Sequence, residues 1–168
     1  LDDSQLGSYE LVSRDMFLFS CFTGLSYTDI YHLTRDHLIE EGGMTWIRKP
    51  RVKTARMCHI PLLPEASAII ERYRGIHTRA FRHEPPEGYL LPIPGCHTVN
   101  IHLKKIAVLC HISKRLTFHM ARHTFASQMT LAEGVSIESV SKMLGHSEIK
   151  TTQVYAETSP ERIFKDVT

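Results

Sequence analysis

Apolar residues recur at helical spacing along most of this chain, and that spacing points to a mainly helical fold. Between residues 9 and 22 they occupy positions 11, 12, 16, 19 and 22, which predicts a helix with one buried face. Gly24 is expected to end this helix, because glycine readily adopts the left-handed conformation of a C-cap. Thr28 can cap a short second helix over residues 28–33. Further helices are expected over residues 64–74, 99–110, 117–132, 136–145 and 151–157.

One stretch departs from the helical pattern. Residues 44–48 and 55–62 are typical of two short strands, and the basic residues 49–54 between them are expected at a hairpin tip. Residues 75–97 are rich in glycine and proline, which predicts mostly loop with a short extended piece at YLLPI. The expected fold class is therefore α+β, mainly α with a small antiparallel β-sheet, in a single domain over residues 1–168.

Composition excludes several classes of protein. The chain has 168 residues, of which 42% are hydrophobic, and no apolar run is long enough to span a membrane. The polar start LDDSQLGSYE lacks the features of a signal peptide, so we expect a cytoplasmic protein without a membrane partner. The net charge of +2 does not by itself imply nucleic acid, but five of the 20 Lys and Arg residues lie within residues 48–56.

The cysteines do not form a recognisable metal-binding pattern. None of the four is in a CxxC pair, and free thiols are the expectation for a cytoplasmic protein. Three are followed directly by histidine, but adjacent residues point in different directions and make a poor chelate. We therefore expect no metal cofactor.

A basic cluster, HMARH, covers residues 119–123. On a helix, His119, Arg122 and His123 lie within about one turn of each other. The spacing of the histidines matches a zinc protease helix, but Met120 stands where that chemistry needs glutamate, and Arg122 would repel a dication. The cluster is better suited to an anion such as phosphate. The alternative, one packed and one solvated histidine, stays open.

A second segment, LGHSEIKTTQVY, covers residues 144–155. His146 follows a glycine that is expected to end a helix, and Tyr155 comes nine residues later. The reference pKa of a phenol is about 10, but nearby cations lower it and a histidine can accept the proton. A tyrosine beside such a cluster is a candidate nucleophile.

Three phrases together resemble the tyrosine recombinases, the phage integrase family: HMARHTFAS, GVSIESVSKMLGHSEIKTTQVYA and FTGLSYTDI. The likeness extends over about residues 9–158 and is strongest to integrases of Bacteroidetes mobile elements. It implies a DNA breaking–rejoining catalytic domain, here without the amino-terminal core-binding domain of full-length relatives. It also implies double-stranded DNA as the partner, a homo-tetramer on paired DNA sites when full length, a nucleoid-associated location, and neither metal nor ATP.

The resemblance also implies roles for individual residues. Tyr155 would attack a DNA phosphodiester, forming a 3′-phosphotyrosyl link and releasing a 5′ hydroxyl. His119 and Arg122 match the two positions that hold the phosphate in the family, and His146 matches the site histidine that follows a glycine. Lys53, at the hairpin tip, would protonate the leaving oxygen, and Lys49 on the same hairpin could compete for that role.

One position departs from the family. Ser26 stands where most members carry an arginine. Either another basic residue replaces it, with Arg14 the first candidate and Arg35 the second, or the protein is a catalytically impaired DNA-binding remnant. Asp29 matches an acidic position that supports the site, although it could simply be a helix-cap partner.

Other residues are expected to touch the DNA backbone or to be ordinary surface charges. They are Lys49, Arg51 and Arg56 on the hairpin, and Lys150, Thr151 and Thr152 before the nucleophile. A zinc-dependent hydrolase and a relaxing topoisomerase remain as further functional alternatives.

Overall fold

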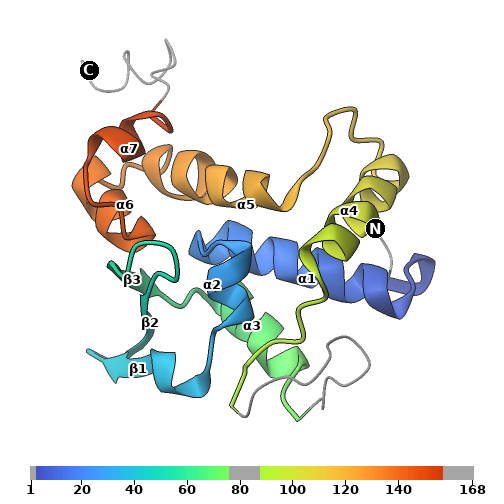
Figure 1. Ribbon diagram of the computed structural model, residues 1–168, viewed down its shortest axis with the longest axis horizontal. Helices are drawn as coiled ribbons and strands as arrows, with labels where there is room; N and C mark the ends of the chain where they lie inside the picture. The colour runs from blue at the N-terminus through green and yellow to red at the C-terminus, as the bar shows by residue number, and fades with distance from the viewer. Residues whose placement is uncertain (1–2, 76–87, 157–168) are drawn as a thin grey trace.

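A computed structural model describes residues 3–75 and 88–156 of the chain (Figure 1). The helix α1 (Ser8–Thr23) runs through the centre of the molecule, between α3 (Pro64–Arg72) and α5 (Phe118–Thr124). The helix α4 (Cys96–Leu109) also packs on α1. Because three helices cover it, α1 buries large side chains, and Met16 and Phe19 are wholly inaccessible to solvent.

A three-stranded antiparallel sheet lies at one end of this helical layer. Its order is β1 (Leu38–Glu41), β2 (Met44–Pro50) and β3 (Met57–Pro61). The hairpin of β2 and β3 confirms the two expected strands, with Ile47 opposite Ile60 on the buried face. The strand β1 was not predicted, because the sequence LIEE has no clear alternation of apolar and polar residues.

The short helix α2 (Tyr27–Tyr31) follows α1 and precedes a 3₁₀ turn at Arg35–His37. The prediction of Thr28 as its N-cap was wrong by two residues. Ser26 is the cap, and its hydroxyl accepts a hydrogen bond from the Asp29 N–H at 3.3 Å. Serine and threonine have similar capping preferences, so residue type alone could not separate the two positions.

The carboxyl-terminal helices follow the predicted order. The helix α5 continues into a π-helical segment, Phe125–Leu131. The two segments together span the helix expected over residues 117–132. The helix α6 (Ile137–Leu144) begins after Ser136 and ends at Gly145, as expected, and packs on β3. The last helix, α7 (Lys150–Gln153), is shorter than predicted.

Other expectations have mixed outcomes. The four cysteines are free thiols, with Cys21 and Cys58 buried. A bridge between Thr34 and Tyr89 confirms an extended piece at the start of YLLPI. Of the predicted loop over residues 75–97, residues 76–87 lie outside the described residues. Among the residues that are described, no helix is long and apolar enough to cross a bilayer.

The close approach of α1 to α5 and α6 depends on Gly24. Its backbone has φ +67° and caps α1 through a hydrogen bond from its N–H to Ser20 O at 2.8 Å. A Cβ atom there would lie 2.8 Å from the Leu144 side chain and nearer still to the Phe125 ring. Only glycine satisfies both the backbone angle and this packing.

We predict that Gly24→Ala destabilises the protein more than Gly42→Ala does. Gly42 also has a positive φ, +63°, but a Cβ there meets nothing within 4 Å. The control variant should therefore cost about 1 kcal/mol of backbone strain. Gly24→Ala should cost a further 1–3 kcal/mol, roughly, from overpacking. Urea unfolding of both variants measures the difference, and equal losses would contradict the packing argument.

Candidate active site

Arg122 is the buried centre of the candidate site. It lies on α5 and is only 4% exposed. Its Nη1 donates to Gly24 O at 2.6 Å, and its Nη2 donates to Leu144 O at 2.8 Å. These carbonyls lie at the C-terminal ends of α1 and α6, which carry partial negative charge and lack helical partners. The fold thus holds one guanidinium where three helices meet.

His146 lies against this guanidinium. Its Nε2 is 3.0 Å from Arg122 Nη2, and its Nδ1 is 2.8 Å from the Thr152 hydroxyl. Burial, and then the charges of Arg122 and Arg51, lower the pKa of His146 to about 4. The imidazole is therefore neutral at physiological pH.

Tyr155 follows α7 and packs among imidazole rings. Its ring is 4.6 Å from that of His123, centre to centre, in an edge-on contact. It lies nearly parallel to the ring of His146 at 6.2 Å. His119 is next in the row, 5.3 Å from His123, and burial followed by the charges of His123 and Arg122 lowers its pKa. The predicted residues His119, Arg122, His146 and Tyr155 thus converge.

His123 was not assigned a site role from the sequence. The structure places its ring between those of His119 and Tyr155. The sequence signal that could have identified His123 is its position four residues after His119, on the same face of one helix.

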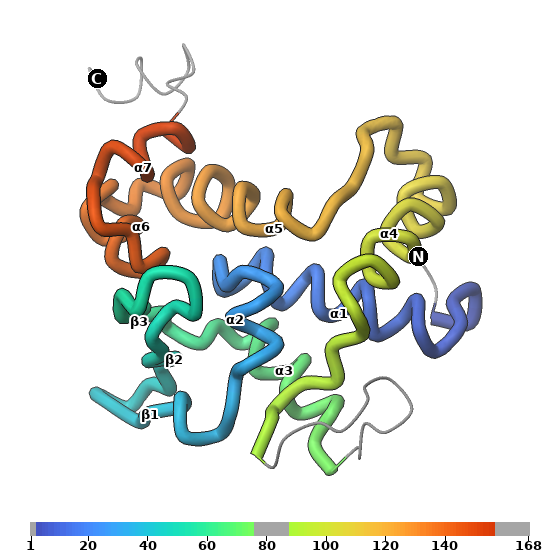
Figure 2. Tube along the Cα trace, in the orientation of Figure 1, coloured from blue at the N-terminus to red at the C-terminus, as the bar shows by residue number. Residues whose placement is uncertain are grey.

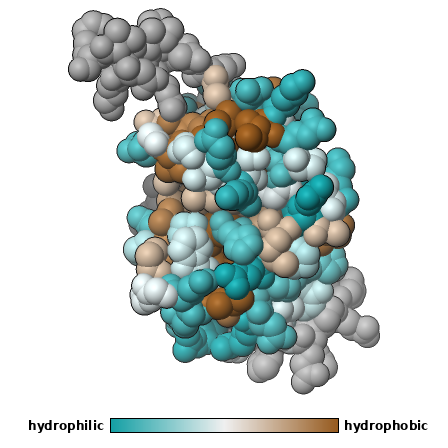
Figure 3. Space-filling view, turned by 90° about the vertical axis from the view of Figure 1, so that its left-hand side faces the viewer, coloured by the Kyte–Doolittle hydropathy of each residue, from teal (hydrophilic) through white to brown (hydrophobic). Residues whose placement is uncertain are grey.

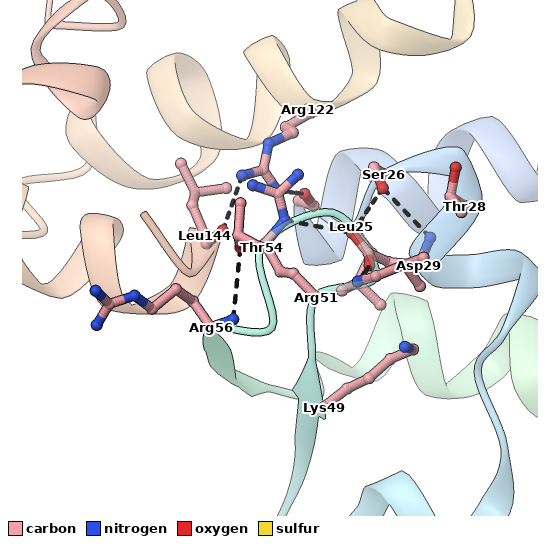
Figure 4. Close-up of polar contacts among 12 residues, drawn as sticks. Leu25, Ser26, Thr28, Asp29, Lys49, Arg51, Thr54, Arg56, Arg122 and Leu144 are labelled. Carbon is pink, nitrogen blue, oxygen red and sulfur yellow. Dashed lines mark hydrogen bonds and ion pairs between the residues drawn. The ribbon is translucent and has the colours of Figure 1, made fainter. Parts of the chain in front are cut away.

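Asp29 supports the other side of the site (Figure 4). It is 1% exposed and accepts hydrogen bonds from the Ser26 hydroxyl at 2.6 Å and the Val52 N–H at 2.9 Å. Burial acts to raise the pKa of Asp29, but these two bonds and the charges of Arg51 and Lys49 outweigh it, so the pKa lies below its usual value. Asp29 is thus an anion that binds the hairpin loop to the start of α2.

Arg51 is the second arginine at the site. Its Nε lies 3.5 Å from Asp29 Oδ2, and its side chain is 12% exposed. Figure 4 shows its guanidinium beside that of Arg122. Burial and then the charge of Arg51 lower the pKa of Arg122, consistent with their proximity. The hairpin loop passes close under α6, since a Cβ at Gly145 would lie 3.0 Å from Arg51 Cδ (Figure 2).

The structure does not bring Arg14 to this site, so the prediction of Arg14 as the replacement arginine needs correction. The Arg14 guanidinium forms ion pairs with Asp3 and, at 2.9 Å, with Asp15. Asp15 is 2% exposed and also binds Arg72 and the Tyr73 hydroxyl, both at 2.8 Å, between α1 and α3. A buried carboxylate needs such partners, and it holds Arg14 away from Arg122.

Two of the predicted DNA contacts are buried. Lys49 is 4% exposed and donates to Pro50 O at 3.1 Å, because alternation along β2 turns it inward with Ile47. Thr152 is fully buried and bonds His146. Neither side chain is available to a DNA backbone, and Lys49 is not a free competitor of Lys53.

The remaining predicted residues are exposed. Lys53 lies at the hairpin tip, two residues after Arg51, and Arg56, Lys150 and Thr151 are also open to solvent. Seen from the side of the hairpin and α6, the surface is mostly hydrophilic with scattered apolar patches (Figure 3). Such a surface suits a polar partner more than an apolar one. Within the described part of the chain, no three His, Cys, Asp or Glu residues are grouped to hold a metal.

Comparison with known proteins assigns the chain to a family. The model of the phage integrase family matches residues 1–162. The chain belongs to this family. The tyrosine recombinase XerD of Lacticaseibacillus casei is 30% identical over 159 residues, which cover 91% of this chain and 53% of that protein. The XerD of Staphylococcus saprophyticus is 43% identical over 63 residues, 38% of this chain and 21% of that protein. The chain thus spans about half the length of the XerD of Lacticaseibacillus casei.

Solved structures show the same fold. A pre-cleavage complex of the XerH site-specific recombinase with difH substrate has a TM-score of 0.71 at 16% identity, covering 99% of this chain and 49% of that one. The Tn1549 transposon integrase with circular intermediate DNA has a TM-score of 0.68 at 18% identity, covering 99% and 64%. The expected fold class, a mainly helical integrase-family catalytic domain with a small antiparallel sheet, is confirmed.

We predict that His146 makes folding stability depend on pH between about 6.5 and 4. Its pKa in the folded protein is about 4, against 6.5 for an unperturbed histidine. The unfolded chain therefore binds the proton more readily in this window, and stability falls as pH falls through it. His146→Gln removes this contribution, so wild type should lose its advantage over the variant between pH 7 and pH 4.5. Urea unfolding at both pH values tests this, and a constant difference would contradict it.

Proposed function

We propose that this protein is a tyrosine-type site-specific DNA recombinase, an integrase of the kind carried by Bacteroidetes mobile elements. The observation that supports this most strongly is the packing of Tyr155 against His123 and His146, with the buried Arg122 beside His146. This arrangement combines a nucleophile, a neutral proton acceptor in His146 and a cation for a phosphate. It needs no metal or ATP.

The proposed reaction is an in-line displacement at phosphorus. The phenolic oxygen of Tyr155 forms a bond to the phosphorus while a histidine accepts its proton, and the bond to the 5′ oxygen breaks. Lys53 donates a proton to that leaving oxygen, which gives a 5′ hydroxyl. The 3′-phosphotyrosyl link retains the energy of the broken bond, so the reverse attack by a 5′ hydroxyl rejoins DNA.

Hydrogen-bond donors, two of them guanidinium groups, stabilise the charge that develops on the nonbridging oxygens. Arg122 and His119 come from α5. Arg51 takes the part of the arginine that most family members carry at the position of Ser26. Arg51 is suited to this because Asp29 orients its Nε from behind, at 3.5 Å, while its guanidinium lies beside Arg122. Two adjacent guanidinium groups are costly without an anion, which a scissile phosphate would supply.

The proposed partner is double-stranded DNA, on which the full-length protein acts as a homo-tetramer at paired sites in the cytoplasm, associated with the nucleoid. Among the similar structures, the XerH recombinase is bound to its difH substrate and the Tn1549 integrase is in complex with a circular intermediate DNA. Arg56, Lys150 and Thr151 are exposed and are proposed to bind the phosphate backbone. Such contacts position the duplex without reading its sequence.

Covalent capture tests the nucleophile. We expect wild-type protein to form a denaturation-resistant adduct with nicked duplexes from the ends of the element that carries its gene. Tyr155→Phe should form none while binding the same DNA, because it lacks only the phenolic oxygen. Denaturing gels and a binding assay measure the two properties. Tight binding by wild type without any adduct would support the alternative, a catalytically impaired DNA-binding remnant.

A comparison of two arginine variants tests the replacement of the missing arginine. Arg51→Ala should slow adduct formation by about 10²–10³-fold, the usual effect of removing one donor to a developing oxyanion. Arg14→Ala is the matched control and should retain the wild-type rate, because Arg14 pairs with Asp3 and Asp15 away from the site. The reverse ranking would show that Arg14, and not Arg51, reaches the phosphate.

A further inference from the structure

We infer that Thr152 is a positioning residue that holds His146 in a single tautomer, with the proton on Nδ1 and a lone pair on Nε2 facing Arg122. The catalytic consequence of this tautomer rests on the proposed function. The tautomer itself does not.

The inference begins with the contacts on the two sides of one imidazole ring. The Thr152 Oγ1 lies 2.8 Å from His146 Nδ1, and Thr152 is fully buried. On the other side, Arg122 Nη2 lies 3.0 Å from Nε2. The ring is thus clamped between a hydroxyl and a guanidinium.

The chemistry of these partners decides where the proton lies. A guanidinium can only donate hydrogen bonds, so Nε2 must accept and cannot carry a proton. A neutral imidazole has one N–H, which must then be on Nδ1 and must be donated to the threonine hydroxyl. The opposite tautomer would set two N–H groups against each other. Burial and the two arginine charges, which lower the pKa of His146 to about 4, favour the neutral ring that this reasoning requires.

The same threonine also joins the nucleophile to the site. Its backbone carbonyl accepts a hydrogen bond from the Tyr155 N–H at 3.0 Å. The helix α7 is only four residues long, so its place depends on tertiary contacts more than on its own hydrogen bonds. Through its side chain and its carbonyl, Thr152 therefore fixes both His146 and the start of the Tyr155 turn.

This tautomer gives His146 a defined part in the proposed reaction. Its Nε2 keeps a lone pair on the side of Arg122, so His146 is suited to accept a proton and not to donate one to a phosphate. When a phosphate takes the Arg122 donor, that lone pair is released on a ring that lies nearly parallel to the Tyr155 ring, 6.2 Å away. A threonine hydroxyl at Nδ1 then stabilises the imidazolium that forms, much as an orienting group does in other histidine-containing sites.

The direct test reads the tautomer by NMR. Protein labelled with ¹⁵N-histidine is compared for wild type, Thr152→Val and Thr152→Ser, with the His146 signals assigned by their loss in His146→Gln. Valine keeps the shape of threonine without the hydroxyl, whereas serine keeps the hydroxyl. We expect protonated Nδ1 and unprotonated Nε2 in wild type and in Thr152→Ser, and a loss of this single state in Thr152→Val.

Adduct formation on the nicked duplexes provides the second measurement. Thr152→Val should reduce the rate by about 10- to 100-fold, by analogy with metal-bound histidines, for which loss of the hydrogen-bond partner has an effect of that size. Its DNA affinity should not change, because Thr152 is buried. Thr152→Ser should restore most of the rate. A purely structural role would instead lower stability and DNA binding together, with serine and valine alike.

Two results would overturn the inference. One is a proton on Nε2 of His146 in wild type, which can be seen even if Thr152→Val does not fold. The other is an unchanged tautomer in a folded Thr152→Val. If wild type shows the expected tautomer but forms no adduct, the inference about Thr152 is supported and the proposed function fails.

Discussion

The guanidinium of Arg122 joins the parts of the protein that form the candidate site. A buried charge is costly unless hydrogen bonds satisfy it, and here the carbonyls of Gly24 and Leu144 do so at 2.6 and 2.8 Å. These acceptors exist because α1 and α6 end at this point and leave their last carbonyls without helical partners. The approach requires a glycine at the end of α1, since a Cβ there would meet Phe125 and Leu144. The site is therefore a consequence of how the ends of α1 and α6 pack against α5.

The position of Arg51 supports the proposal that another arginine compensates for Ser26. Ser26 carries no charge, but its hydroxyl binds Asp29, and Asp29 in turn binds the hairpin loop through the Val52 N–H. That loop brings Arg51 beside Arg122 from a different part of the chain. One buried carboxylate thus serves both the α2 cap and the loop. Asp29 pairs with Arg51, and Arg51 lies beside Arg122, which supports the proposal of a working site.

Local patterns predicted most of the fold. The helical spacing located α1, α4, α5 and α6, and the glycines after α1 and α6 marked their ends. Failures occurred where local sequence is ambiguous. The strand β1 has no alternation of its own and is defined only by its pairing with β2, and neighbouring Ser and Thr residues compete equally as caps. Neither the pairing nor the choice of cap is encoded within a few residues.

For the site, the sequence by itself determined the chemical groups that are close in the chain or on one helix. His119 and Arg122 share a helix turn. His146 follows the end of α6, and Tyr155 follows the end of α7 nine residues later. Only the tertiary structure decided which arginine accompanies Arg122, and it also buried Lys49 and Thr152. Residue type and periodicity specify neighbours within one element. Contacts between distant segments, such as Arg51 with Asp29 or Arg72 with Asp15, depend on how buried charges pair when helices and hairpin pack together.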